Sequence, residues 1–119
     1  MATFDFLRNE TGAREYKAGE AIFRAGDPGE SMFAVVDGEV EIRIKDRVLE
    51  LLVPGGVFGE MALIDKSPRS ADAIAKTDCT VTSLTQRRFM YLVQETPFFA
   101  IDIMRTLAER LRRYTSPVS

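Results

Sequence analysis

A carboxylate and a guanidinium lie close together in one short stretch of the chain. Gly59 precedes Glu60, and Arg69 follows a turn formed by residues 65–68. A glycine has no Cβ, so a ligand can approach its backbone closely. A guanidinium is a rigid fork that fits two phosphate oxygens at once. A carboxylate accepts hydrogen bonds from hydroxyl groups. These residue types together suit a ligand that carries both a phosphate and a sugar hydroxyl.

The segment that must position these groups is short. Residues 60–64 are compatible with a helix, and the first N–H groups of a helix have no partner inside it. Such N–H groups can point at an anion. The sequence therefore predicts a helix start, a carboxylate and an arginine near one another.

The stretch from Phe58 to Ala71 resembles the phosphate-binding cassette of the cyclic nucleotide-binding domain family. The family pattern is Phe-Gly-Glu, a hydrophobic residue, a small residue, a variable loop, then Pro-Arg, a small residue and Ala. This chain reads Phe58-Gly59-Glu60-Met61-Ala62 and Pro68-Arg69-Ser70-Ala71. The match is specific because order, spacing and chemistry agree together. Residues 16–23 and 26–27 also resemble the opening of the family.

The resemblance implies a role for each matching residue. The cyclic phosphate would meet Arg69 and the backbone N–H groups after Gly59, and the ribose 2′-hydroxyl would meet Glu60. Ser70 would touch the phosphate or the amino group of a guanine, and a serine here favours cAMP over cGMP. The expected ligand-binding residues are Phe58, Gly59, Glu60, Met61, Ala62, Arg69, Ser70 and Ala71.

Each of these roles has a plainer alternative. Arg69 could be a surface arginine after a turn, and Glu60 a charge that complements a helix dipole. Ser70 could be a hydroxyl at the start of a strand that faces solvent. The complete motif favours the ligand-binding interpretation of Arg69 and Glu60.

The chain contains no histidine and one cysteine, Cys79. The usual zinc and non-haem iron ligands are therefore missing, as are the Ser-His and Cys-His nucleophile pairs. An internal disulfide is impossible, and Cys79 is expected to be a small buried apolar residue. We expect no catalytic residues, no metal site, no enzyme activity and no cofactor other than the ligand cAMP or cGMP.

Length and composition indicate one globular domain. The chain has 119 residues, of which 45% are hydrophobic, and a net charge of −2. That charge does not favour a general nucleic-acid binder. We expect a mainly β fold with C-terminal helices: an antiparallel β-roll, similar to a jelly roll, over residues 13–86 with the cassette at 58–71. A helical segment over 1–12 would precede it, and helices over 87–115 would follow.

The local patterns predict the individual elements. Residues 32–36 and 40–44 read as a β-hairpin that turns at Asp37-Gly38. Pro97 is suited to the first position of a helix over 97–114. An apolar stripe at helical spacing is expected to be core; it comprises Phe98, Ile101, Met104, Leu107, Ala108 and Leu111. The other expected strands are 14–18, 21–24, 48–53, 70–75 and 80–85, with a further helix at 87–94.

The resulting hypothesis is a cytoplasmic regulatory domain that binds a cyclic nucleotide and relays binding through the helices after Thr85 to an effector protein. A homodimer through the C-terminal helix is a further expectation. No DNA-binding domain and no membrane-spanning segment are expected in this chain. The rival is an interaction or dimerisation module that kept the fold and lost the ligand. A metal-dependent enzyme on a related β-barrel is disfavoured by the missing histidines.

Overall fold

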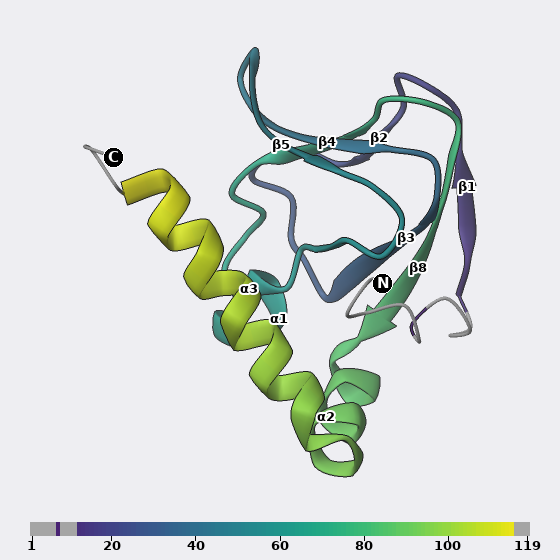
Figure 1. Cartoon of the computed structure of the whole chain (residues 1–119). Helices are drawn as coiled ribbons and strands as arrows, with labels where there is room; N and C mark the ends of the chain where they lie inside the picture. Colours follow the sequence, from purple (N-terminus) through teal and green to yellow (C-terminus); the bar gives the residue numbers. More distant parts are fainter. Residues whose placement is uncertain (1–6, 8–11, 116–119) are drawn as a thin grey trace. The chain divides into compact units, whose positions relative to one another are not determined.

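The computed structural model describes residue 7 and residues 12–115, with the side chains of 114 and 115 left aside (Figure 1). The chain divides into two compact units, one up to Gln86 and one from Arg87, and each is described by itself. Apart from Leu7 and Gly12, the helical segment predicted over 1–12 lies outside the described residues.

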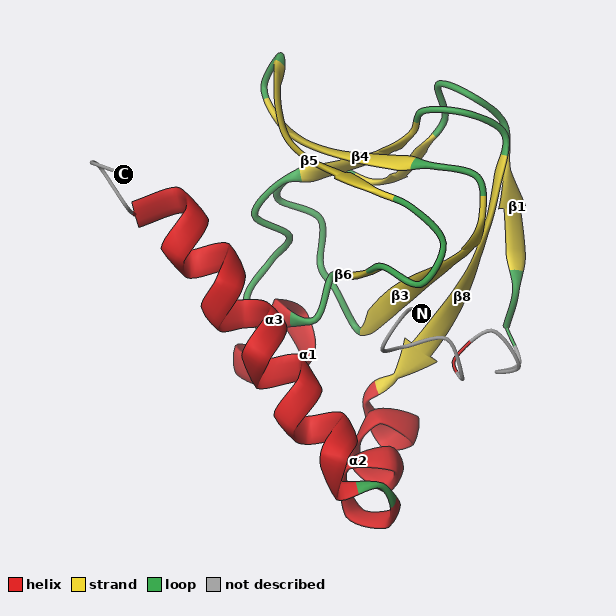
Figure 2. Cartoon of the chain, in the orientation of Figure 1, coloured by secondary structure: helices red, strands yellow, loops and turns green. Residues whose placement is uncertain are grey.

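The first unit is a β-roll built from two antiparallel four-stranded sheets (Figures 1 and 2). The strand order in one sheet is β1-β8-β3-β6, formed by Arg14–Tyr16, Cys79–Thr85, Ser31–Asp37 and Val57–Phe58. The order in the other is β2-β7-β4-β5, formed by Ala21–Phe23, Asp72–Ala75, Val40–Ile44 and Arg47–Leu52. The predicted mainly β fold is confirmed.

The hairpin predicted between residues 32–36 and 40–44 is wrong, because β3 and β4 belong to different sheets. The turn between them packs tightly. Gly38 has a φ of +80°, and a Cβ on it would lie 2.3 Å from the carbonyl oxygen of Asp78. The chain therefore crosses from one sheet to the other at this glycine. The actual hairpin joins β4 to β5, with Ile44 opposite Arg47.

The interior of the roll explains why the strands form where they do. Apolar side chains from both sheets meet in one cluster, whose burial favours folding. Its buried members are Val35, Val40, Leu52, Phe58, Ala73, Ala75, Cys79 and Val81. Cys79 is 5% exposed, as the sequence predicted for a small buried residue. Phe58 belongs to this cluster, so the start of the cassette is fixed to the core.

The second unit contains α2 (Gln86–Glu95), which starts at its boundary, and α3 (Pro97–Thr115). Phe89 and Phe99 pack edge to face, with ring centroids 5.5 Å apart. Phe99 and Ile103, one helical turn apart, are 1% and 3% exposed. No helix in the described part of the chain is long and apolar enough to cross a membrane.

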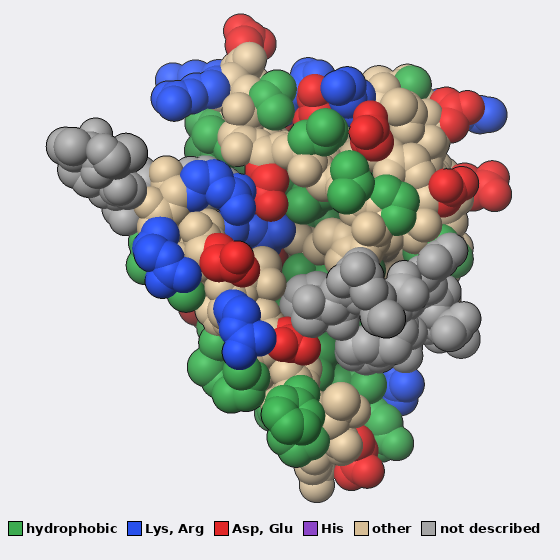
Figure 3. All heavy atoms as spheres, in the orientation of Figure 1, with side chains coloured by type: hydrophobic (Ala, Val, Ile, Leu, Met, Phe, Trp, Pro, Cys, Tyr) green, Lys and Arg blue, Asp and Glu red, His purple; other side chains and the backbone are tan. Residues whose placement is uncertain are grey.

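The stripe predicted as core on the last helix is mostly on the surface. Phe98 is 77% exposed, Met104 58% and Leu111 62%. Green apolar side chains are visible at the surface of the helical part of Figure 3. Apolar residues occur on more than one side of α3, so helical spacing alone does not reveal which side is covered.

Candidate phosphate-binding site

The cassette, residues 58–71, connects β6 to β7 through a short helix. Gly59 has a φ of +80°, a conformation that favours glycine, and α1 (Met61–Asp65) follows it. Lys66, which has a left-handed φ of 59°, caps the end of the helix. The N–H of Ser67 then donates to the carboxylate of Asp65 at 3.0 Å. This compact turn leads the chain to Arg69.

The side chain of Arg69 turns inward and is only 8% exposed. Its Nη1 donates to the carbonyl oxygen of Gly59 at 2.9 Å, and its Nη2 donates to that of Ser31 at 2.7 Å. Its Nε is buried and has no hydrogen-bond partner among the described residues. The guanidinium thus joins the start of the cassette to the start of β3 and keeps one buried donor unused.

Two aromatic rings lie against this guanidinium. The Cζ atom of Arg69 is 4.2 Å from the ring centroid of Phe23 and 5.5 Å from that of Phe33. Both rings also pack with Phe58, at centroid distances of 5.9 Å and 5.3 Å. Ring faces attract a cation and exclude water from it. The positive charge therefore lies in an environment where its interaction with an anion is stronger than in water.

Burial also lowers the pKa of the Arg69 guanidinium from its ordinary value, while the charges of Asp27 and Glu60 act in the opposite direction. An arginine nevertheless remains protonated at neutral pH. The site therefore presents a partly desolvated cation, a type of group that makes stronger hydrogen bonds to anions than a neutral donor does.

The predicted site residues differ in their burial. Glu60 is 3% exposed, so it is not a solvated charge at a helix start, and the burial of Arg69 excludes a plain surface arginine. The structure brings Arg69 into contact with Gly59, and the charge of Glu60 acts on Arg69. Phe58, Ala62 and Ala71 are buried, whereas Met61 and Ser70 are exposed.

The loop between β2 and β3 holds the backbone of Arg69. The N–H of Gly26 donates to the carbonyl oxygen of Arg69 at 2.7 Å, and the N–H of Arg69 donates to that of Asp27 at 2.8 Å. Because both bonds come from one loop, the position of Arg69 depends on residues more than forty positions earlier in the sequence.

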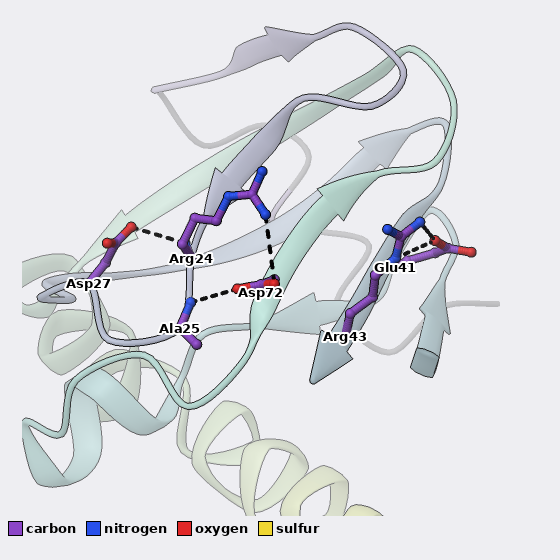
Figure 4. A network of polar contacts seen from close by, with 6 residues as sticks. All are labelled: Arg24, Ala25, Asp27, Glu41, Arg43 and Asp72. Atoms are coloured by element: carbon purple, nitrogen blue, oxygen red, sulfur yellow. Dashed lines mark hydrogen bonds and ion pairs between the residues drawn. The ribbon is translucent and has the colours of Figure 1, made fainter. Parts of the chain in front are cut away.

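Two carboxylates hold the same loop: that of Asp27, which lies in the loop, and that of Asp72, the first residue of β7 (Figure 4). The side chain of Asp27 accepts a hydrogen bond from the N–H of Arg24 at 2.9 Å. The side chain of Asp72 accepts one from the N–H of Ala25 at 2.8 Å and faces the guanidinium of Arg24 at 3.8 Å. A separate pair, Arg43 and Glu41, lies on β4.

Sequence reasoning missed four residues that surround the guanidinium: Phe23, Gly29, Ser31 and Phe33. Phe23 ends β2 and Phe33 lies in β3, so both look like ordinary strand residues. Gly29 looks like one more turn residue. For Phe23 the available signal was the family-like block at residues 16–23, which gave no residue roles; Gly29, Ser31 and Phe33 lie outside that block.

The sequence profile of the cyclic nucleotide-binding domain matches residues 13–96. The chain belongs to the cyclic nucleotide-binding domain family. It is 36% identical over 104 residues to the "Cyclic AMP receptor protein" of Thermus thermophilus, covering 83% of this chain and 48% of that protein. The chain thus spans about half the length of this relative.

Solved structures agree with this assignment. The crystal structure of the Thermus thermophilus catabolite activator protein gives a TM-score of 0.82 at 35% identity, covering 92% of this chain and 54% of that one. A structure titled "A cyclic-GMP-dependent signalling pathway regulates bacterial phytopathogenesis" gives a TM-score of 0.77 at 30% identity, covering 93% and 94%. The described residues contain no group of three or more His, Cys, Asp or Glu that could hold a metal ion.

Proposed function

We propose that this domain binds a cyclic nucleotide, with the cyclic phosphate at Arg69. The observation that carries the proposal is the buried guanidinium, whose Nε lacks a partner among the described residues. A buried donor without a partner costs free energy, which a phosphate oxygen would recover. The aromatic rings of Phe23 and Phe33 strengthen that bond by excluding water.

The other cassette residues complete the proposed site. Glu60 accepts a hydrogen bond from the ribose 2′-hydroxyl, which compensates for the presence of a carboxylate near an anionic phosphate. Gly59, Met61 and Ala62 contribute backbone N–H groups, consistent with the exposure of the Met61 side chain. Phe58 and Ala71 form the buried support of the cassette. Ser70, which is exposed, is available to the phosphate or the base.

We propose a preference for cAMP over cGMP, which rests on the serine at position 70 and on the name of the Thermus thermophilus relative. The similar structure from a cyclic-GMP-dependent signalling pathway favours the opposite preference, for cGMP over cAMP. Isothermal titration calorimetry with cAMP, cGMP and 5′-AMP tests both points. We expect affinity to fall in that order, because the linear monophosphate differs in shape and charge. Tighter binding of cGMP would reverse the preference, and no binding of either cyclic nucleotide would contradict the proposed function.

The proposed role is a regulatory domain of the cytoplasm, without catalytic activity, which relays binding to an effector through the helices after Thr85. Slower amide exchange over residues 98–114 in the presence of nucleotide would support this relay. Equal protection in both states would contradict the relay and leave binding intact.

A second role, self-association, is favoured by the exposed apolar residues of α3. Phe98, Ile101, Met104 and Leu111 are each 46% exposed or more. Apolar side chains that gather on a surface commonly mark an interface. A homodimer along this helix is compatible with nucleotide binding. If the domain binds no nucleotide, self-association through α3 is the rival function.

A further inference from the structure

Gly29 is a glycine whose backbone does not require one. Gly19 and Gly26 both have a φ of +91°, a region that other residues rarely adopt. Gly29 is outside that region, so no left-handed backbone calls for a glycine there. The reason for a glycine at this position must therefore lie in the space around it.

That space is occupied by the guanidinium of Arg69. A Cβ on Gly29 would lie 2.6 Å from Nε and 2.7 Å from Cζ of Arg69, and 2.8 Å from Cβ of Ala62. Favourable contacts between carbon atoms are about 3.5–4.0 Å long. One methyl group at position 29 would therefore collide with the arginine and with α1 together.

The guanidinium cannot yield to that methyl group without losing contacts. Its Nη1 and Nη2 are held by the carbonyl oxygens of Gly59 and Ser31. The ring of Phe23 covers it at 4.2 Å. Ala62, which the added group would also meet, is 5% exposed and belongs to α1. Relief of the collision thus requires a shift of the guanidinium or of the cassette helix.

We propose that Gly29 is a positioning residue of the phosphate site: its missing side chain makes room for the buried guanidinium of Arg69. The inference rests on the proposed function and extends the site to the loop before β3. Gly29 touches no phosphate in this scheme. It acts through Arg69, whose backbone the same loop already holds through Gly26 and Asp27.

The test compares Gly29→Ala with Gly19→Ala, a matched control. Gly19 has a left-handed backbone, and a Cβ on it would meet nothing within 4 Å. We expect Gly19→Ala to lower thermal stability and to leave the Kd for cAMP within a factor of about three. Gly29→Ala should raise that Kd by about tenfold or more, as measured by calorimetry.

A spectroscopic measurement separates positioning from general loosening. In ligand-free protein, the Nε–Hε resonance of Arg69 can be assigned by its loss in Arg69→Ala. We expect it to move in Gly29→Ala and to stay in place in Gly19→Ala. If Gly29→Ala does not fold, the triple variant Gly29→Ala/Ala62→Gly/Arg69→Ala should fold, because both groups that collide with the methyl group are gone.

The outcomes distinguish the positioning role of Gly29 from the binding of a cyclic nucleotide. If the parent binds cAMP, an unchanged Kd or an unmoved Nε resonance in Gly29→Ala overturns the inference alone. A triple variant Gly29→Ala/Ala62→Gly/Arg69→Ala that remains unfolded when Gly29→Ala is unfolded also overturns it. A parent that binds neither cAMP nor cGMP overturns the proposed function, and the positioning role for a phosphate falls with it.

Discussion

The cassette and the last helix depart from ordinary burial in opposite directions. In the cassette, two charged side chains are buried, with Glu60 3% and Arg69 8% exposed. In α3, large apolar side chains are on the surface, with Phe98 77% and Leu111 62% exposed. Glutamate and arginine are rarely buried unless paired, whereas large apolar residues are usually inside.

A buried charge and an exposed apolar side chain differ in their free-energy cost to the folded chain. A buried charge is expensive unless it is paired and hydrogen-bonded. The inward orientation of Arg69 therefore indicates a function that outweighs its cost. An exposed apolar residue costs the folded chain little, but a group of them favours association. The comparison is the basis of the two proposals made above, a ligand site in the cassette and an interaction surface on α3.

Replacement of the buried cation tests the cassette side of this comparison most strongly. Arg69→Ala removes the partner of a desolvated phosphate, so we expect a loss of about 2–5 kcal/mol in the free energy of cAMP binding. The Kd would rise roughly thirtyfold to several thousandfold. Arg69→Lys keeps the charge without the fork and should recover part of the affinity. Calorimetry measures all three proteins.

A stability measurement must accompany these variants. Arg69 and Glu60 are both buried, so their replacement can affect folding as well as binding. Arg69→Ala leaves the carbonyl oxygens of Gly59 and Ser31 without this donor, at a cost of about 1–3 kcal/mol. Relief of the buried charge offsets part of that cost. A folded Arg69→Ala protein that binds cAMP within a factor of about three of the parent would place the ligand elsewhere.

Ligand addition should stabilise the folded parent by an amount comparable to the binding free energy lost in Arg69→Ala. A nucleotide that binds the native cassette and not the unfolded chain adds about 2.7 kcal/mol at a concentration a hundredfold above Kd. Thermal melting with increasing cAMP measures the shift, and Arg69→Ala is the control in which it should be much smaller. A parent whose melting temperature does not respond to millimolar cAMP or cGMP would favour the ligand-free interaction module.

Neutralisation of the buried carboxylate should have a smaller effect. Glu60→Gln keeps the shape and one acceptor for the ribose hydroxyl, but loses the charge that makes the bond stronger. We expect a loss of about 1 kcal/mol, or roughly fivefold in Kd. Titration with cAMP and with 2′-deoxy-cAMP measures it. The deoxy ligand should bind parent and variant almost equally, and an undiminished difference between the two proteins would contradict the proposed contact.

The sequence predicted the cassette well because its geometry is local. Gly59, the short helix and the turn before Arg69 follow one another in the chain, so their residue types could be interpreted together; the bonds from Gly26 and Asp27 that hold Arg69 could not be predicted in this way. The surroundings of the guanidinium were missed because Phe23 and Ser31 are placed by sheet pairing and Gly29 by the loop between those two strands. The same cause explains the wrong hairpin: alternation predicted the strands of 32–36 and 40–44 but not their partners.

Two adjacent residues of α3, one buried and one exposed, test the surface side of the comparison. Met104 is 58% exposed and Ile103 is 3% exposed, although they are neighbours on one helix. Ile103→Ala should lower the free energy of unfolding by about 2–5 kcal/mol, as buried truncations do. Met104→Glu should change it by less than about 0.5 kcal/mol, as substitutions at exposed positions do. Chemical denaturation at low protein concentration measures both.

Sedimentation at high protein concentration then shows whether the exposed face has a partner of its own kind. If α3 forms the homodimer, Met104→Glu should shift the equilibrium toward monomer, because two carboxylates near a shared apolar interface repel and lose water. The melting curve of the dilute protein should not change. A parent that sediments as a monomer with and without cAMP would remove self-association. The exposed apolar residues of α3 would then have to serve a different partner.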